Sequence, residues 1–194
     1  MKKIHKLLLV TLVMGFALPS YAKCRLPVEK NDEFSGEKIR STRNVTLYSN
    51  IFTSRGLKAT MLSEGGKTTF ILEYMAPGLL NKNVPKGSIV MIKTKDKSII
   101  KLKANERVEP EQHKRLVENI NVHEGGNSLY GSSHTNDLSY TKYSIKYDVD
   151  AESLKKFSES PISALRFKVV KEETFKLNNH HSNIFKKAAK CLVK

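Results

Sequence analysis

The sequence of 194 residues lacks tryptophan and contains only two cysteines, Cys24 and Cys191. No Cys-x-x-Cys spacing occurs that would lower a thiol pKa for redox catalysis. The glycine pairs do not lead into the Gly-Lys-Ser of a phosphate-binding loop, and no Gly-x-Ser-x-Gly nucleophile turn occurs. After residue 22 there is no apolar run long enough to span a bilayer. These absences disfavour a thiol oxidoreductase, a nucleotide triphosphatase, a common serine hydrolase and a transmembrane helix in the mature chain.

Residues 1–22 have the organisation of a secretory signal peptide. Three lysines come first, an uncharged apolar run follows, and small residues precede the predicted cleavage after Ala22. The apolar run is shorter than the roughly 20 residues of a membrane-spanning helix. Lys23 stands directly before Cys24, where lipoprotein processing needs a small residue. The leader is similar to those of Gram-negative bacteria, so we expect a periplasmic or secreted protein without a lipid anchor.

Residues 23–194 are predicted to form a single α+β domain, since 172 residues suffice for one hydrophobic core. The whole chain has 34 Lys and Arg against 19 Asp and Glu, a formal charge of +15. Removing the leader, which holds three lysines and no acid, leaves +12. Export places Cys24 and Cys191 in an oxidising compartment, which predicts a disulfide between the two ends of the mature chain.

The first half of the mature chain predicts an antiparallel meander of hairpins. Apolar and β-branched runs alternate with turn residues, and Gly65 and Gly66 can adopt the positive φ of a hairpin turn. The five predicted strands have the sequences NVTLYS, GLKATML, KTTFILEYM, SIVMIKT and SIIKLKA.

The segment of residues 105–137 is polar and rich in Glu, Asn, His, Ser and Gly, which predicts a loop-rich region. Residues 109–119 suit a helix with Pro110 in its first turn. Loops of this length in a small domain are often functional and often only mobile, and both interpretations remain open here.

Regular structure is predicted again from about Tyr140. Tyr143 and Tyr147 alternate along a half-buried strand, and Asp150 is suited to cap a short helix that ends at Pro161. A strand with the sequence ISALRFKVVK follows. An amphipathic helix from about Ser182 is expected to pack on the sheet, with an apolar face formed by Ile184, Phe185, Ala188, Ala189 and Leu192.

Two stretches carry a resemblance to other proteins. They are NDEFSGEKIRST near the start of the mature chain and YDVDAESLKKFSESPISALRFKV before the last helix. With the hairpins between them, they resemble a broad group of small exported bacterial proteins whose mature chains open with an Asp-x-Phe-Ser/Thr-Gly segment. The resemblance covers most of residues 31–193. It implies an α+β fold and transfers no activity, because its motifs mark turns and helix caps.

The excess of lysine is the feature most open to a functional interpretation. If the clusters met on one face, they could attract anionic polymers of the cell envelope. The competing interpretation is a solvated strand face, because many of the lysines alternate with apolar residues and lysine lacks the bidentate geometry of arginine. The candidate contact residues are Lys93, Lys95, Lys97, Lys101, Lys103, Lys186, Lys187 and Lys190.

The histidines support an enzyme or a metal site less well. His113, His123 and His134 share the polar segment, and His134 lies near Ser132, Ser133 and Asp137, but catalytic triads are assembled from distant segments. The adjacent His180 and His181 cannot easily face one metal ion. We therefore expect no cofactor, no metal site and no catalytic residue.

Three functional hypotheses result. The first is an exported, non-catalytic binding or interaction protein of unknown ligand. The second is a basic surface that docks on anionic envelope polymers. The third is a hydrolase-like enzyme that uses the histidine-rich middle segment. The first is favoured because no catalytic constellation occurs in the sequence.

Overall fold

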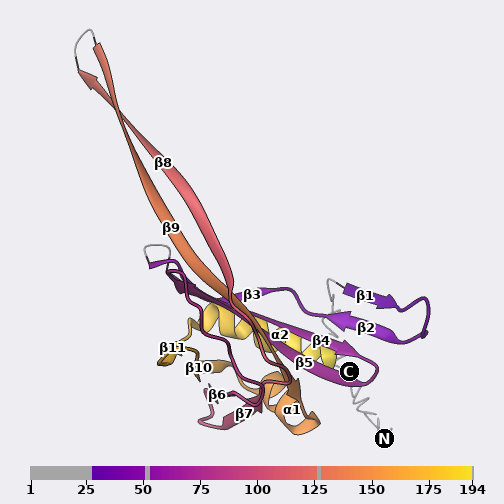
Figure 1. Ribbon diagram of the computed structural model, residues 1–194. Helices are drawn as coiled ribbons and strands as arrows, with labels where there is room; N and C mark the ends of the chain where they lie inside the picture. Colours follow the sequence, from indigo (N-terminus) through magenta and orange to yellow (C-terminus); the bar gives the residue numbers. More distant parts are fainter. Residues whose placement is uncertain (1–27, 51–52, 126–127, 194) are drawn as a thin grey trace, which may run out of the picture.

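The computed structural model describes residues 28–50, 53–125 and 128–193, with residues 115–138 described through their backbone. The predicted signal peptide and Cys24 lie outside these residues. Within the described part, the chain forms mostly antiparallel β-structure in two curled sheets with two helices, one of them C-terminal (Figure 1). The prediction of a broadly α+β fold is confirmed. No helix among these residues combines the length and apolar character needed to cross a membrane.

The larger sheet has seven strands. In order across the sheet they are β1 (Val28–Asn31), β2 (Lys38–Ser41), β4 (Arg55–Glu64), β5 (Lys67–Pro77), β9 (Ser128–Val149) and β8 (Glu111–Gly125), with β3 (Val45–Asn50) also paired to β4. The smaller sheet has the order β11 (Glu172–Lys176), β10 (Ile162–Lys168), β6 (Ile89–Thr94) and β7 (Ile99–Lys103). The two helices are α1 (Ala151–Glu159) and α2 (Asn179–Leu192).

The five strands predicted as one meander are divided between the two sheets. The hairpins β4–β5 and β6–β7 both form, but they belong to different sheets. The reason lies in the connection after β5, where Pro77 cannot donate a ladder hydrogen bond and Gly78 has a φ of 77°. The chain therefore leaves the larger sheet, and a bridge between Val84 and Val108 holds this connection before β6 begins.

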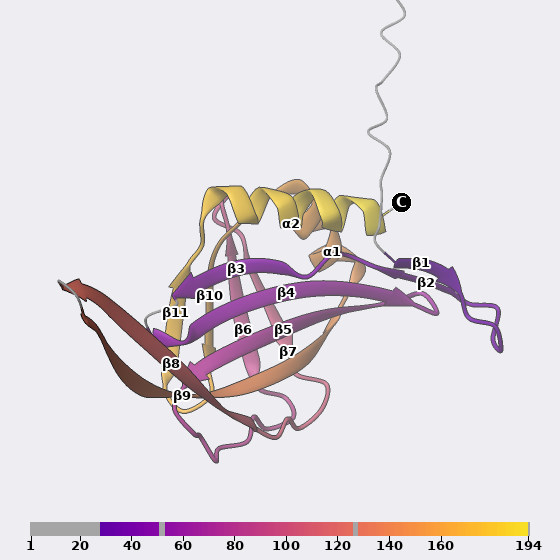
Figure 2. The same cartoon turned by 90° about the horizontal axis from the view of Figure 1, so that it is seen from above.

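Both sheets contribute one face to a common core. A bridge between Ala104 and Tyr147 joins the end of β7 to β9, and so connects the two sheets along one side. Phe70 of β5 lies 5.9 Å from Phe157 of α1 and 5.8 Å from Phe185 of α2, measured between ring centroids. Through these ring contacts, both helices pack against the core. Figure 2 shows α2 lying along β3, which it contacts together with β10 and α1.

The two helices begin at polar caps. Asp150 accepts a hydrogen bond from the Ser153 N–H at 2.6 Å, which confirms it as the cap of α1. Asn178 accepts from the His180 N–H at 2.8 Å, so α2 begins three residues before the predicted Ser182. Along α2, Phe185, Ala189 and Leu192 are buried as predicted. Ile184 was assigned to the same face but is 41% exposed, since it lies a step of about 100° around the helix from Phe185.

The polar segment forms a two-stranded ribbon, and the predicted helix over residues 109–119 is wrong. β5 pairs with β9 only as far as Tyr140, and beyond that point β8 and β9 pair with each other alone among the described residues. At about 3.3 Å per residue, residues 114–125 extend the ribbon by roughly 40 Å from the body (Figure 1). A ribbon with no sheet beneath it needs no alternating apolar face, which is why its sequence resembles a loop.

Candidate functional site

The smaller sheet has one buried face and one face exposed to solvent. Along each of its strands, apolar residues that enter the core alternate with residues that point outward. Six of the outward residues are cationic, and we call this surface the basic face. It consists of Lys93 on β6, Lys101 and Lys103 on β7, Arg166 and Lys168 on β10, and Lys176 on β11.

The strand register arranges the basic face in rows. In one row Met91 stands between Arg166 on β10 and Lys101 on β7. Because neighbouring strands are about 4.8 Å apart, the backbones that carry these two cations are roughly 10 Å apart. In the next row, the order across the sheet is Lys176, Ala164, Lys93 and Ile99. Cations therefore alternate with apolar side chains across the strands of the face.

The charge of the basic face is poorly compensated. Its one acid is Glu172, whose carboxylate lies 3.8 Å from Nε of Arg166, and both side chains are largely exposed. Among the described residues, no carboxylate lies within ion-pairing distance of the five lysines of the face. Like charges held on one rigid sheet create a positive potential that attracts anions.

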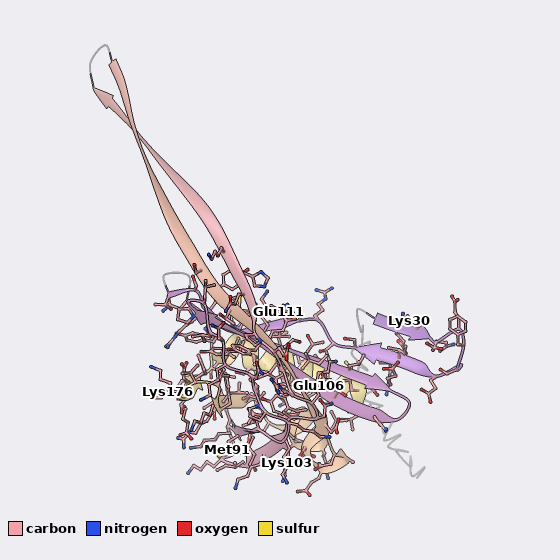
Figure 3. The ribbon with its side chains drawn as sticks, viewed as in Figure 1. Lys30, Met91, Lys103, Glu106, Glu111 and Lys176 are labelled. Atoms are coloured by element: carbon pink, nitrogen blue, oxygen red, sulfur yellow. The ribbon has the colours of Figure 1, made fainter. Side chains whose placement is uncertain are left out.

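Apolar side chains interrupt the cations. Ile89 and Ile99 are 48% and 58% exposed, although each is large enough to be expected in a core. A groove of about 560 Å³ is lined by Ile89, Met91, Lys101 and Arg166 among others. In Figure 3, Met91 and Lys103 lie on the side of the body away from the ribbon. The face therefore offers both charge and apolar contact to a ligand.

The structure brings together three of the eight lysines predicted to contact anions, Lys93, Lys101 and Lys103. Lys95 and Lys97 are exposed in the turn between β6 and β7, at the rim of the face. Their neighbour Asp96 accepts hydrogen bonds from Thr94 and from the Ser98 N–H, and these bonds, that of Thr94 first, lower its pKa. The Asp96 carboxylate is thus engaged in shaping the turn.

The other three predicted residues, Lys186, Lys187 and Lys190, lie on α2. This helix packs toward the core through Phe185 and Ala189, so its lysines belong to a separate surface. The sequence grouped them with the strand lysines only because both clusters are basic.

Sequence reasoning missed three cations of the basic face, Arg166, Lys168 and Lys176. The signal for the first two was present, because they alternate with Leu165 and Phe167 in a predicted strand and must point away from the core. Lys176 had no such signal, since β11 was not predicted.

The histidines of the polar segment do not converge in the ribbon. His113 and His123 are ten residues apart on β8, about 33 Å along a strand. The register places His134 opposite Asn119, about four residues from His123 along the ribbon. In the part of the chain that the structure describes, no group of three or more His, Cys, Asp or Glu residues could hold a metal ion.

Comparison with other proteins adds no assignment. No protein-family model, no curated protein and no solved structure matches the chain.

Proposed function

We propose that the protein is an exported, non-catalytic binding protein that docks on anionic polymers of the cell envelope through the basic face. The observation that carries the proposal is the group of six cations on the smaller sheet, five of which have no ion-pair partner among the described residues. A sheet presents side chains at fixed spacings, so a polymer with repeated anionic groups can engage several lysines at once. Each contact releases counterions, which makes the binding dependent on salt.

Phosphate-bearing envelope lipids such as lipopolysaccharide suit this face better than a purely hydrophilic polyanion. Ile89, Met91 and Ile99 lie among the cations, and two of them are exposed to a degree that an apolar partner would relieve. A ligand with phosphate groups beside acyl chains can satisfy both kinds of side chain. The α+β scaffold, with its C-terminal helix packed on the core, holds the face rigid.

Location in the envelope rests on the predicted leader, which lies outside the described residues. Cleavage after Ala22 would place the mature chain in the periplasm or beyond. N-terminal sequencing of the exported protein should read Lys23 first, and the intact mass should show no acyl group.

Retention on immobilised polymers tests the proposal. Wild-type protein should be retained on lipopolysaccharide and on heparin and elute with salt, and it should pass through neutral dextran. The triple variant Lys93→Gln, Lys101→Gln, Lys103→Gln should elute from lipopolysaccharide at a clearly lower salt concentration. Equal elution of the two proteins would contradict the proposal, and equal retention on dextran would show that charge is not responsible.

A further inference from the structure

A second cavity, of about 340 Å³, opens where β4 begins, β5 ends and the connection from β10 to β11 passes. Its apolar wall includes Leu80, Phe167 and Val169. Tyr74 also lines it, and the Tyr74 ring meets the Phe167 ring edge-on at 5.1 Å. Phe167 and Val169 also line the groove beside the basic face, but none of the six cations of that face lines this cavity. Its volume lies at the lower end of the range for small-molecule sites.

One end of the cavity is polar. Nη2 of Arg55 lies 3.3 Å from Oε1 of Glu173, and their side chains are 33% and 17% exposed. Burial, and then the negative charge of Glu173, raises the pKa of Tyr74, so its hydroxyl remains protonated. Lys171 also lines the cavity. The polar end therefore holds two cations, one carboxylate and one neutral hydroxyl.

The wall formed by residues 77–80 is held in place by hydrogen bonds. The Leu80 N–H donates to Oγ1 of Thr141 at 2.8 Å, and the same hydroxyl donates to the Gly78 carbonyl at 2.7 Å. Thr141 is fully buried on β9, which fixes this segment against the larger sheet. The cavity is thus formed before a ligand arrives, and binding need not order this wall.

We infer that this cavity binds a small molecule with an apolar body and one carboxylate group. The apolar body fits against Leu80, Phe167 and Val169, and the carboxylate lies at Arg55. The guanidinium has five N–H donors and donates one hydrogen bond to Glu173. The remaining donors can still bind a carboxylate in a bidentate manner. A cationic ligand fits less well because Glu173 is already paired and Lys171 repels it.

Three chain-matched probes distinguish the possible ligand classes: octanoate, octylamine and octanol. Isothermal titration of the full mature protein should give saturable binding of one octanoate and markedly weaker binding of the other two. The double variant Arg55→Gln, Glu173→Gln should weaken octanoate binding about tenfold or more, because the charge-assisted hydrogen bonds are lost. Both residues are changed together so that Glu173 is not left without its partner.

A reporter at the rim provides a second measurement that does not depend on the charged pair. Val170 lines the cavity and is 47% exposed, and the chain has no tryptophan of its own. The fluorescence of Val170→Trp should change saturably with octanoate and not with octylamine. The Lys93, Lys101, Lys103 triple variant is the control and should bind octanoate as the wild type does. Equal binding of octylamine or octanol, unchanged binding by the double variant, or no octanoate binding would overturn the inference.

Discussion

Thr42 shows how one buried side chain holds two strands together at the residue scale. Its N–H donates to the Met61 carbonyl at 2.8 Å, and its Oγ1 accepts from the Met61 N–H at 2.8 Å. Thr42 is 3% exposed and Met61 is fully buried, so water cannot replace either bond. The hydroxyl thus continues the pairing to β4 at the point where β2 ends.

Thr42→Val should remove the acceptor while keeping the shape of the side chain. The buried Met61 N–H would be left unpaired, and the free energy of unfolding should fall by about 1–3 kcal/mol. Urea denaturation measures this difference. Thr60→Val, on the outward side of β4, is the control and should change stability by less than about 0.5 kcal/mol. Equal effects of the two changes would show that the Thr42 hydroxyl contributes no special stability.

Asp150 should make the stability of α1 depend on pH. Its hydrogen bond from the Ser153 N–H is the largest cause that lowers its pKa below the ordinary 3.8. The folded chain therefore binds this proton less readily than the unfolded chain. The stabilisation is complete above the unfolded pKa and is lost as the pH falls through the folded pKa.

The variant Asp150→Ser isolates this effect, because serine caps a helix without titrating in this range. Between neutral pH and about pH 3, the wild type should lose more unfolding free energy than Asp150→Ser does. Urea denaturation at both pH values gives the two losses. All other acids are common to both proteins, so equal losses would contradict the assigned role of the carboxylate.

Residue-level features were predictable where a local rule acts alone. Asp150 was identified because a cap depends on its immediate neighbours, and Tyr143 and Tyr147 because strand alternation decides which side is buried. The outward direction of Arg166 could be predicted from strand alternation, but its place beside Met91 depends on β6 and β10 pairing in a particular register. Contacts between distant segments cannot be predicted from the local sequence pattern.

Among the elements, the ribbon of β8 and β9 depends least on the rest of the chain. Its strands have no neighbouring strand other than each other beyond Tyr140, within the described residues. Limited proteolysis should therefore cut first between Asn121 and Asp137. First cuts within the hairpins of the body would contradict this expectation.

Replacing residues 115–138 by an Asn-Gly turn should leave the body intact. The core residues of β9, Tyr143, Ile145 and Tyr147, lie beyond the deleted part of that strand. The melting temperature should therefore change by less than about 3 °C, or about 1 kcal/mol for a chain of this size. Thermal unfolding followed by circular dichroism measures the shift. Removing residues 62–69 from the β4–β5 hairpin is the control and should prevent folding, since Phe70 would lose its place in the core. A large loss from the ribbon deletion would show that the ribbon supports the body.

Element types in the body were easier to predict than those of the ribbon, because the core imposes a pattern on the sequence. The predicted helix over residues 109–119 failed since helix and strand cannot be distinguished where the sequence has no clear apolar periodicity. The division of the hairpins between two sheets could not be predicted either. It depends on the direction that the chain takes after Pro77, and the local sequence does not indicate this direction.

At the scale of the whole molecule, the predicted disulfide would join the two ends of the mature chain. Nη2 of Arg40 donates to the Leu192 carbonyl at 3.2 Å, which ties the end of α2 to β2. Arg40 pairs with Glu29 of β1, only five residues after Cys24. Five extended residues reach about 17 Å, so Cys24 can approach Cys191.

Cys24→Ser and Cys191→Ser should lower the melting temperature equally, and the double variant should be no less stable than either. The bond restricts the unfolded chain and holds the terminal helix, and each single change removes it completely. Thermal unfolding of the three variants tests additivity. Free thiol in the denatured, unreduced exported protein would contradict the prediction.

The distribution of charge over the molecule is uneven in a way that composition alone does not reveal. The ribbon segment of residues 111–139 has four acids and two bases, although the chain as a whole carries +15. The positive charge of the described residues therefore belongs to the body, where the basic face gathers six cations on one sheet. The net charge predicted attraction to anions, but only the strand register shows which lysines act together.

The salt dependence of lipopolysaccharide binding tests this account most directly. The face variant Lys93→Gln, Lys101→Gln, Lys103→Gln is compared with Lys186→Gln, Lys187→Gln, Lys190→Gln on α2, which loses the same three charges. Dissociation constants are measured over a range of salt concentrations, and the logarithm of affinity is plotted against that of salt. The face variant should bind more weakly and with a shallower slope than the wild type, while the α2 variant stays close to the wild type. Equal losses in both variants would mean that net charge alone drives binding, and would contradict the assignment of the basic face.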